Sequence, residues 1–350
     1  MSLTYKGALV DTLIDFSWLS KLLYLGLESV IQRLYVFLDP SQGLFLGYIL
    51  SALVVALLFQ SYQTKSWNFI WLMKSLIQLH KLKSKSTVDD IKLYLVDKVL
   101  LGFMYSFILS SAFVVKQSVL DLLSIVGLPI IHVEVGLLLS GLLTLGAIIV
   151  FDFATFFEHY LAHKVRFLWE FHKIHHIADN LNPLTAYRSH PVNQICFVLI
   201  VSLFTGIYSG VINHLFPSEQ LYIVIAGQNV FMLIFLIMGL NLQHSHVFIR
   251  YPRFVRSILV SPAYHQIHHS SLRKHHDVNF GFLFSFWDQI FNTQVMPTKQ
   301  EVLTFGVAGE KYDNYAGVLN MYLTPFKRVA RRMFKRHETV ASSKENRVEP

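Results

Sequence analysis

Five long runs without Asp, Glu, Lys or Arg set the pattern of this chain. Each run is 17 to 25 residues long, and they are residues 43–62, 99–115, 135–151, 192–216 and 220–243. A helix needs about 20 apolar residues to cross the hydrocarbon core of a bilayer. The pattern therefore predicts an all-α protein, an integral membrane helical bundle of about four to five spans.

The ends of these runs predict how the helices continue. The third run extends past Asp152 and Glu158 to His163, so we expect this helix to project beyond the membrane surface. The fourth and fifth runs are separated by only three residues, 217–219, which predicts a tight helical hairpin.

Two further segments are apolar but interrupted by charge. In residues 10–38, five charged side chains fall within an arc of about 140°, as in a helix that lies in the membrane interface. Residues 326–337 place six Lys and Arg opposite an apolar face, which predicts a basic surface helix. The polar residues 338–350 are expected to be disordered.

Composition supports a membrane protein and excludes other classes. The chain has 350 residues, of which 15% are charged, whereas an ordinary soluble domain has about 25%. A single cysteine, Cys196, rules out an intrachain disulfide and a thiolate metal site. The net charge of +8 fits topology and attraction to anionic lipid better than nucleic-acid binding, so no nucleic-acid partner is expected.

The basic residues are concentrated in particular connections between the predicted spans. The connections over residues 63–98 and 159–191, together with the chain after residue 242, hold 26 of the 30 Lys and Arg. If the spans alternate in direction, all 26 lie on one face, which the positive-inside tendency makes cytosolic. We therefore expect a multi-pass protein of the bacterial inner membrane, or of the endoplasmic reticulum in a eukaryote.

Histidines gather on that same predicted face. Of the 17 in the chain, 14 lie between His159 and His276. His159 and His163 are four residues apart, which places both on one helix face. An HxxHH pattern follows at residues 172–176 and returns at 265–269, and His244 ends the fifth run.

Nine of these histidines are candidate metal ligands. Neutral imidazole is the commonest protein ligand for Zn, Fe, Cu and Ni, and two ions need about four nitrogens each. Nine imidazoles at one membrane face therefore predict a dinuclear site. The candidates are His159, His163, His172, His175, His176, His244, His265, His268 and His269.

For other polar residues in this region, the pattern gives weaker support for metal binding. The spacing does not decide whether four further histidines are ligands, partners that orient ligands, or surface residues. They are His190, His246, His275 and His276. We interpret Asp152 as a buried partner for a hydroxyl group. Glu158 and Glu170 could ligate iron, but neither lies in a repeated pattern.

The order of these motifs resembles the fatty acid hydroxylase superfamily, the sterol desaturase family of histidine-rich di-iron oxygenases. The resemblance covers residues 135–293 and includes the closing stretches 276–281 and 286–293. It implies about four spanning helices and a cytosolic cap in which the nine histidines hold two iron ions. His190, His246 and His276 match positions that vary in the family, and Asp277 and Asn279 match a recurrent segment expected to lie beside the ligands.

The apolar and charge pattern, together with this resemblance, predicts a division of the chain into four parts. Residues 1–42 are an interfacial segment, 43–134 two spans with a basic loop, 135–295 the catalytic region, and 296–350 a basic C-terminal segment. No fused cytochrome b5 domain is present in this sequence, so the electron donor is expected to be separate, of the cytochrome b5 or ferredoxin type with a reductase.

The predicted function is an O2-dependent di-iron membrane oxygenase that hydroxylates or desaturates a lipid, such as a fatty acyl chain, aminolipid or sterol. A transition-metal transporter is an alternative, but transporters bind near the bilayer midplane, whereas these histidines gather at one face. A zinc-dependent membrane lipid hydrolase is a second alternative, because imidazole does not by itself select iron over zinc.

Overall fold

The protein is described here from a computed structural model. It covers residues 35 and 37–345 apart from 79–80, 82, 219 and 298–300, without the side chains of 99–109 and 334–345. Most of the predicted interfacial helix, residues 10–38, therefore lies outside the described residues. Within the described part the only strands are two of two residues each, which confirms the all-α prediction.

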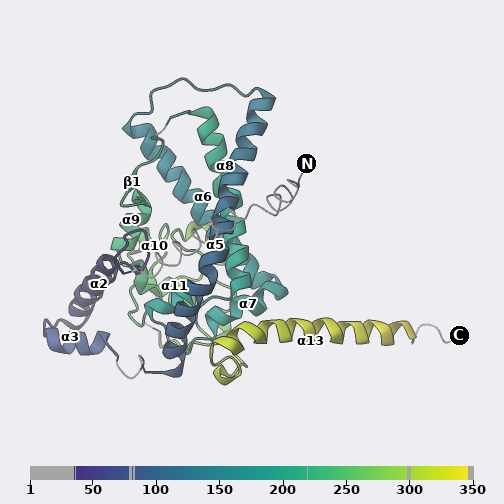
Figure 1. The fold of residues 1–350 in the computed structure, drawn as a ribbon. Helices are drawn as coiled ribbons and strands as arrows, with labels where there is room; N and C mark the ends of the chain where they lie inside the picture. The colour runs from purple at the N-terminus through teal and green to yellow at the C-terminus, as the bar shows by residue number, and fades with distance from the viewer. Residues whose placement is uncertain are drawn as a thin grey trace, which may run out of the picture.

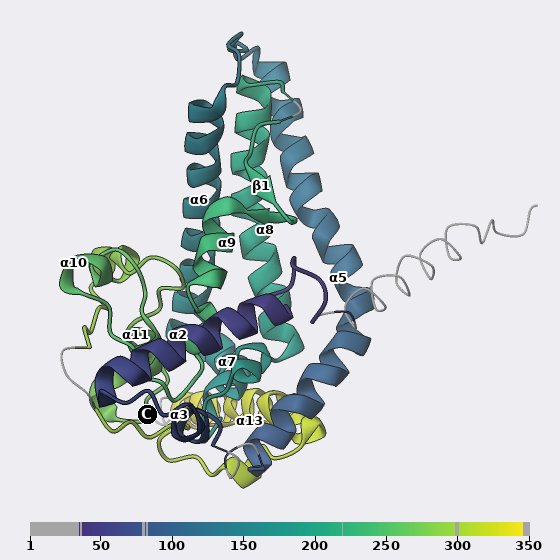
Figure 2. The same ribbon diagram turned by 90° about the vertical axis from the view of Figure 1, so that its left-hand side faces the viewer.

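Three long helices lie side by side and form a bundle (Figure 1). They are α5 (Lys85–Val126), α6 (Leu137–Lys164) and α8 (Pro191–Leu215), with α8 between the other two (Figure 2). Gly206 and Gly210 let α8 approach α5 closely, because a Cβ at these positions would lie 2.7 Å and 2.6 Å from Val115 Cβ and Val119 Cβ.

The helix around the second predicted span is much longer than the span itself. Residues 99–115 are the middle of α5, whose 42 residues correspond to about 63 Å of helix. The side chain of Ser84 accepts a hydrogen bond from the amide of Thr87 at its N-terminus, and Gly127, with φ of 71°, ends it. α5 therefore begins among the elements at one end of the bundle, described below as the cap, and continues through the bundle.

Helix α6 has the extension predicted for it, since it continues without a break from the apolar run to Lys164. Among the described residues, three helices are long and apolar enough to cross a membrane: α2 (Leu46–Thr64), α6 and α8. Together with the apolar composition, they identify a membrane protein.

Helix α2 does not run along the bundle; it lies across it, next to α3 (Phe69–Leu76) (Figure 2). Ala52 and Ala56 on its inner face pack against the 242–249 segment of the cap. Its outer face carries Leu50, Val54 and Leu58, each about half exposed. The first predicted span is thus helical, but it is oriented differently from α6 and α8.

The fifth apolar run is not one helix, so the predicted helical hairpin is wrong. It folds as a small hairpin of β1 (Val224–Ile225) and β2 (Gln228–Asn229), the short helix α9 (Val230–Ile237) and the 3-10 turn η2 (Leu240–Leu242). The side chain of Asn229 donates to the carbonyl of Thr144 and accepts from the amide of Phe231, which fixes the start of α9. Gly239, with φ of 98°, follows its end.

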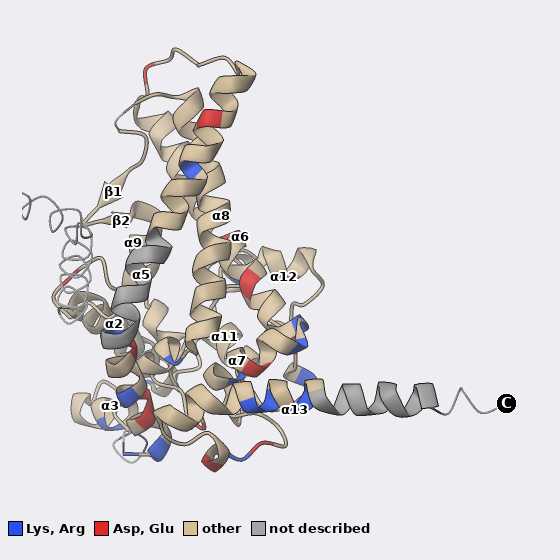
Figure 3. Ribbon diagram, turned by 45° about the vertical axis from the view of Figure 1, so that its right-hand side comes forward, with Lys and Arg blue, Asp and Glu red and all other residues tan. Residues whose placement is uncertain are grey.

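A cap made mostly of short helices, with one long helix at its edge, covers one end of the bundle. Lys and Arg gather around this cap (Figure 3). The last helix is longer than predicted: it begins before residue 326 and continues to Glu345, through part of the tail expected to be disordered. The cap elements are α7 (Arg166–His176), η1 (Pro183–Tyr187), α10 (Arg253–Arg256), α11 (Pro262–His268), η3 (Arg273–His275), α12 (Phe286–Ile290), η4 (Tyr312–Asn314) and α13 (Val318–Glu345).

Candidate metal centre

The candidate ligands converge where α6 meets the cap. His159 and His163 lie on the last turns of α6. Val165 adopts an extended conformation that ends α6 and starts α7, so the first HxxHH pattern folds back toward α6. The second HxxHH pattern lies on and just after α11, whose N-terminus is capped by the Ser261 side chain.

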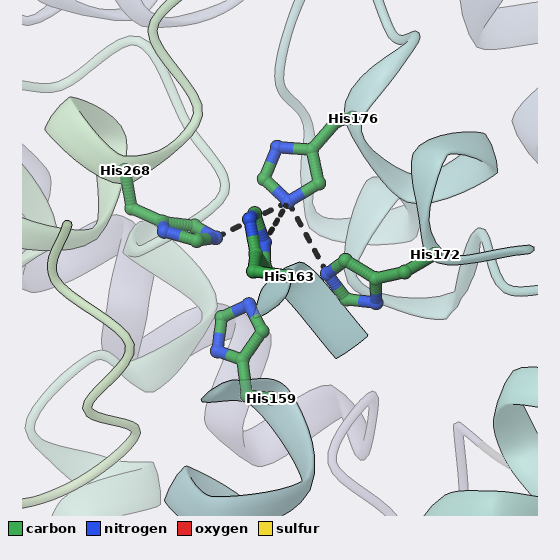
Figure 4. Close-up of side chains that lie close together, drawn as sticks. All are labelled: His159, His163, His172, His176 and His268. Carbon is green, nitrogen blue, oxygen red and sulfur yellow. Dashed lines mark hydrogen bonds between the residues drawn. The ribbon is translucent and has the colours of Figure 1, made fainter. Parts of the chain in front are cut away.

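Five of the nine histidines form one group: His159, His163, His172, His176 and His268 (Figure 4). Each offers a ring nitrogen within 4.8 Å of the others. His176 Nε2 lies 3.1 Å from His163 Nε2, 3.2 Å from His172 Nε2 and 3.2 Å from His268 Nε2. These contacts bring the two HxxHH patterns and the end of α6 to one point.

The other four form a second group: His175, His244, His265 and His269. His244 Nε2 lies 3.3 Å from His175 Nε2 and 3.1 Å from both His265 Nε2 and His269 Nε2. The groups are adjacent, since the rings of His176 and His269 stack with centroids 4.6 Å apart. The structure thus brings together all nine predicted residues, in sets of five and four.

Each HxxHH pattern is divided between the two groups. Its first and last histidines, four residues apart, share a group: His172 with His176, and His265 with His269. The remaining histidine of each pattern belongs to the other group. Histidines four residues apart lie on one helix face, whereas the remaining histidine of each pattern points toward the other group. Each short helix therefore contributes ligands to both groups.

Hydrogen bonds on the outer nitrogens orient the rings. Nδ1 lies 3.0 Å from the Phe280 carbonyl in His159, 2.8 Å from Asn193 Oδ1 in His172, and 2.8 Å from the Val278 carbonyl in His268. These partners are oxygen acceptors, so each Nδ1 donates. In a neutral imidazole that leaves the Nε2 lone pair directed into the group.

The inward nitrogens have an arrangement that suits a cation. His172 Nε2 and His268 Nε2 are both acceptors, and one proton on His176 Nε2 could satisfy only one of them. His159 Nε2 is buried without a hydrogen-bond partner among the described residues. Nitrogens bound about 2.1 Å from one metal lie about 3.0–3.4 Å apart at bond angles of 90–109°, which matches the contacts above.

Burial keeps the cap histidines neutral. It lowers the pKa of His172, His176, His244, His265, His268 and His269 well below the usual value, and neighbouring imidazoles add to this effect. Burial also lowers the pKa of His175 to about 3. Neutral imidazole is the form that binds metal, so the residues present fit a pair of metal ions.

A cavity of about 520 Å³ reaches both groups. His159 and His172 of the first group and His175, His244 and His265 of the second all line it. Much of the remaining wall is apolar and comes from α6, α8, α9 and the closing segment: Phe151, Phe197, Met232, Leu236 and Phe282. A molecule in this cavity would face both groups at once.

Comparison with known proteins gives the same assignment as the motifs. The model of the fatty acid hydroxylase family matches residues 144–293. We call residues 144–293, which this model matches, the hydroxylase region. This match confirms the resemblance drawn from the histidine patterns.

Two curated relatives of the hydroxylase region are lipid enzymes by name. Ornithine lipid hydroxylase OlsE of Rhizobium tropici is 25% identical over 188 residues, which are 53% of this chain and 50% of the relative. Human alkylglycerol monooxygenase is 26% identical over 158 residues, 45% of this chain and 31% of the relative. The chain thus spans half the length or less of these relatives. No solved structure matched significantly. The names of the family and of both relatives all describe hydroxylation or monooxygenation, which are oxidoreductase activities.

The two residues predicted to lie beside the ligands are Asp277 and Asn279, and the structure gives them different contacts. Asp277 Oδ1 is 3.4 Å from His163 Nδ1. Asn279 donates to the carbonyls of Tyr264 and Val295 and accepts from the Val295 amide. Both residues have positive φ, and the turn they form presents the Val278 carbonyl that orients His268.

The three histidines at variable family positions lie outside both groups. His190 Nε2 lies 3.0 Å from the Tyr322 carbonyl, His246 Nε2 lies 3.2 Å from the Ser75 carbonyl, and His276 Nε2 lies 3.2 Å from the Ser271 carbonyl. His190 Nδ1 also accepts from the Val192 amide at the start of α8. Their contacts are structural.

The buried carboxylates of the hydroxylase region hold its parts together. Asp152 accepts from the amides of Leu283 and Phe284 and from the Trp287 indole, rather than from the hydroxyl we expected. Asp288, which was not among the predicted site residues, accepts from the amides of Phe280 and Gly281, the Tyr264 hydroxyl and the Thr293 hydroxyl. Phe280 is thereby fixed where its carbonyl orients His159.

Two further supports for the ligands were not predicted. Asn193 accepts from His172 and donates to Glu158. The Arg188 carbonyl accepts from His175 Nδ1 at 3.2 Å, while the Arg188 side chain forms a buried ion pair with Asp90 of α5. No local spacing relates these residues to the histidines, so only the fold reveals them.

Proposed function

We propose that this protein is an O2-dependent di-iron monooxygenase that hydroxylates an unactivated C–H bond of a membrane lipid. The five-histidine group would hold one iron ion and the four-histidine group the other. The observation that carries the proposal is the cavity that reaches both groups and is otherwise mainly apolar. The names of the two relatives support a lipid as the substrate.

Iron at these positions would supply the activation of O2, by which a C–H bond, O2, two electrons and two protons become C–OH and water. The residues of the chain prepare for this reaction. Phe280, Asn193 and the Val278 carbonyl orient the imidazoles. Apolar side chains such as Phe151 and Phe282 exclude water and hold the hydrocarbon part of the lipid.

The partners follow from the location of the cavity. Its apolar wall comes from α6, α8 and α9, so a lipid would enter from the bilayer beside the bundle. The basic residues around the cap support a cytosolic location for the metal centre, where a separate cytochrome b5- or ferredoxin-type donor with its reductase would deliver electrons.

Metal analysis and an oxygen assay test this proposal together. The full chain is purified anaerobically, its iron and zinc are measured, and it is placed in vesicles with lipid, reductant and O2. We expect two iron ions per chain and a lipid product that has gained one oxygen atom. A product that has lost two hydrogens would indicate desaturation. A zinc-loaded protein that hydrolyses lipid without O2 would overturn the proposal.

A further inference from the structure

Helix α2 is apolar on its outer face as well as on its inner face. Residues 43–62 contain no Asp, Glu, Lys or Arg, and the outer face carries four large apolar side chains, spaced four residues apart and each about half exposed. A helix on a water-exposed surface carries polar residues outside, whereas a helix that is apolar all round is covered by protein or lipid. We call these four side chains the α2 row: Leu46, Leu50, Val54 and Leu58.

Both ends of α2 lie against the cap. Just before its start, Leu44 packs in one apolar cluster with Tyr187 of η1. The middle of its inner face packs against the 242–249 segment. At its end, Gln63 lines a cavity together with Arg256 of α10. The inner face of α2 thus follows the cap along its whole length.

This position does not fit a helix that crosses the membrane beside the bundle. A helix of 19 residues is about 28 Å long, nearly the thickness of the hydrocarbon core, so the ends of a spanning α2 would lie on opposite sides of the bilayer. Helices α6 and α8 run from the cap to the far end of the bundle, whereas α2 lies across their direction (Figure 2). If the bundle crosses the bilayer, α2 is therefore parallel to the membrane plane, with the α2 row facing outward.

The segment after α2 has the side chains that are typical of a membrane interface. Trp67 and Phe69 are mostly exposed, and Trp71 of α3 is about half exposed. Lys65 and Lys74 are exposed in the same segment. Tryptophan is enriched where lipid head groups meet acyl chains, and lysine near a membrane surface is attracted to anionic head groups. These residues therefore favour lipid over protein as the partner of this surface.

The apolar surface of the bundle also continues to α2. Helix α9 packs against α2, and its side chains Ile234 and Ile237, with Met238 directly after them, are each nearly half exposed. Lipid covers the outside of a helical bundle in a membrane. The lipid that covers α9 is therefore adjacent to α2.

We propose that α2 and α3 form an in-plane anchor, in which the α2 row lies among the acyl chains of the leaflet on the cap side, while Trp67 and Lys65 lie at the lipid head groups. Such an anchor fixes the depth of the cap in the membrane. Gly43, just before α2, lines the cavity of the metal centre, so the anchor also places that cavity beside the lipids of this leaflet. The proposal does not depend on the reaction at the metal centre.

Spin labels at matched positions test whether α2 lies flat or crosses the bilayer. The single cysteine, Cys196, is replaced by Ala, and the full chain with Leu46→Cys, Val54→Cys, Leu199→Cys or Ile207→Cys is labelled in vesicles of phosphatidylcholine and phosphatidylglycerol. All four side chains are between 43% and 52% exposed, and the two positions on each helix are about 12 Å apart along its axis. Power saturation with O2, which concentrates in hydrocarbon, and with a water-soluble nickel chelate gives the depth of each label. We expect nearly equal depths for the two labels on α2, and depths that differ by most of about 12 Å on α8.

Equal depths on α2, with access to O2 and little access to nickel, support the in-plane anchor. A depth difference on α2 as large as that on α8 means that α2 crosses, ready access to nickel means that the α2 row faces water, and poor access to both reagents means that protein covers it; each of these results overturns the proposal. Equal depths on α8 contradict the orientation of the bundle and overturn it as well. Leu50→Cys and Leu58→Cys, equally spaced on the same row, repeat the measurement, so a label that disturbs folding at one pair does not decide the result.

Discussion

Replacing Asn193 by leucine tests how the structure prepares a metal ligand. Asn193 Oδ1 accepts the proton of His172 Nδ1 at 2.8 Å, and Asn193 Nδ2 donates to Glu158 at 3.2 Å. The change to Leu removes the acceptor but keeps a side chain of similar size. His172 then has a buried N–H without a partner, and its ring is free to rotate or to move its proton to Nε2.

The expected effect is large enough to measure. A buried donor left unsatisfied costs about 1–3 kcal/mol. Loss of a hydrogen bond that orients a metal-binding histidine typically lowers metal affinity or activity about 10–100-fold, which corresponds to about 1.4–2.7 kcal/mol. The two estimates agree, so we expect the five-histidine group to bind metal about 10–100 times more weakly in Asn193→Leu.

Dialysis against increasing chelator concentrations measures this loss. The variant should release one of its two metal ions at a chelator concentration at which the unchanged protein keeps both. Asn320→Leu is the control, because the side chain of Asn320 is exposed and donates only to Ala316 within its own helix. An unchanged release curve, or the same loss in Asn320→Leu, would refute the role assigned to Asn193.

Three further predictions follow from the same geometry. His172→Ala or His268→Ala should abolish turnover while the protein still inserts into membranes, and His276→Ala should stay active; substantial turnover in either of the first two would mean that the ligands are misassigned. Asp90→Asn leaves the buried Arg188 charge without its partner, which should cost about 3–5 kcal/mol; an unchanged unfolding midpoint in detergent contradicts this. Burial lowers the histidine pKa values, so below about pH 6.5 the unfolded chain binds more protons than the folded one. The histidine contribution to the stability of the metal-free protein is therefore constant above that pH and is lost as the pH falls toward about 3, the pKa of His175, and an unfolding midpoint that rises as the pH falls below about 4, where free carboxyl groups are protonated, would contradict the reasoning.

Local spacing explains which part of the centre could be predicted from the sequence. His159 and His163 share a face because they are four residues apart on one helix, and the two HxxHH patterns gather ligands in the same way. The sequence does not show that His175 joins His244 while its neighbour His176 joins His163. That division depends on how α7 and α11 pack against each other and against the end of α6.

The prediction of a fifth span was wrong because the absence of charged residues does not by itself define a helix. Residues 220–243 contain no charge, yet Ala226 and Gly227 both have positive φ and form the turn between β1 and β2. In lipid, backbone polar groups outside a helix must find partners within the protein. Here the hydroxyl of Thr144 on α6 accepts from the Ile223 amide, and the Thr144 carbonyl holds the Asn229 side chain, whose oxygen accepts from the Phe231 amide.

Helix α5 was the hardest element to interpret from the sequence, because it carries no motif and lies before the matched region. Its first turns nevertheless serve the site: Asp90 holds Arg188, whose carbonyl orients His175, and Tyr94, Asp97 and Lys98 line the cavity. The hydroxylase region thus contains all nine candidate ligands, whereas α5 supplies part of the cavity wall that these ligands share.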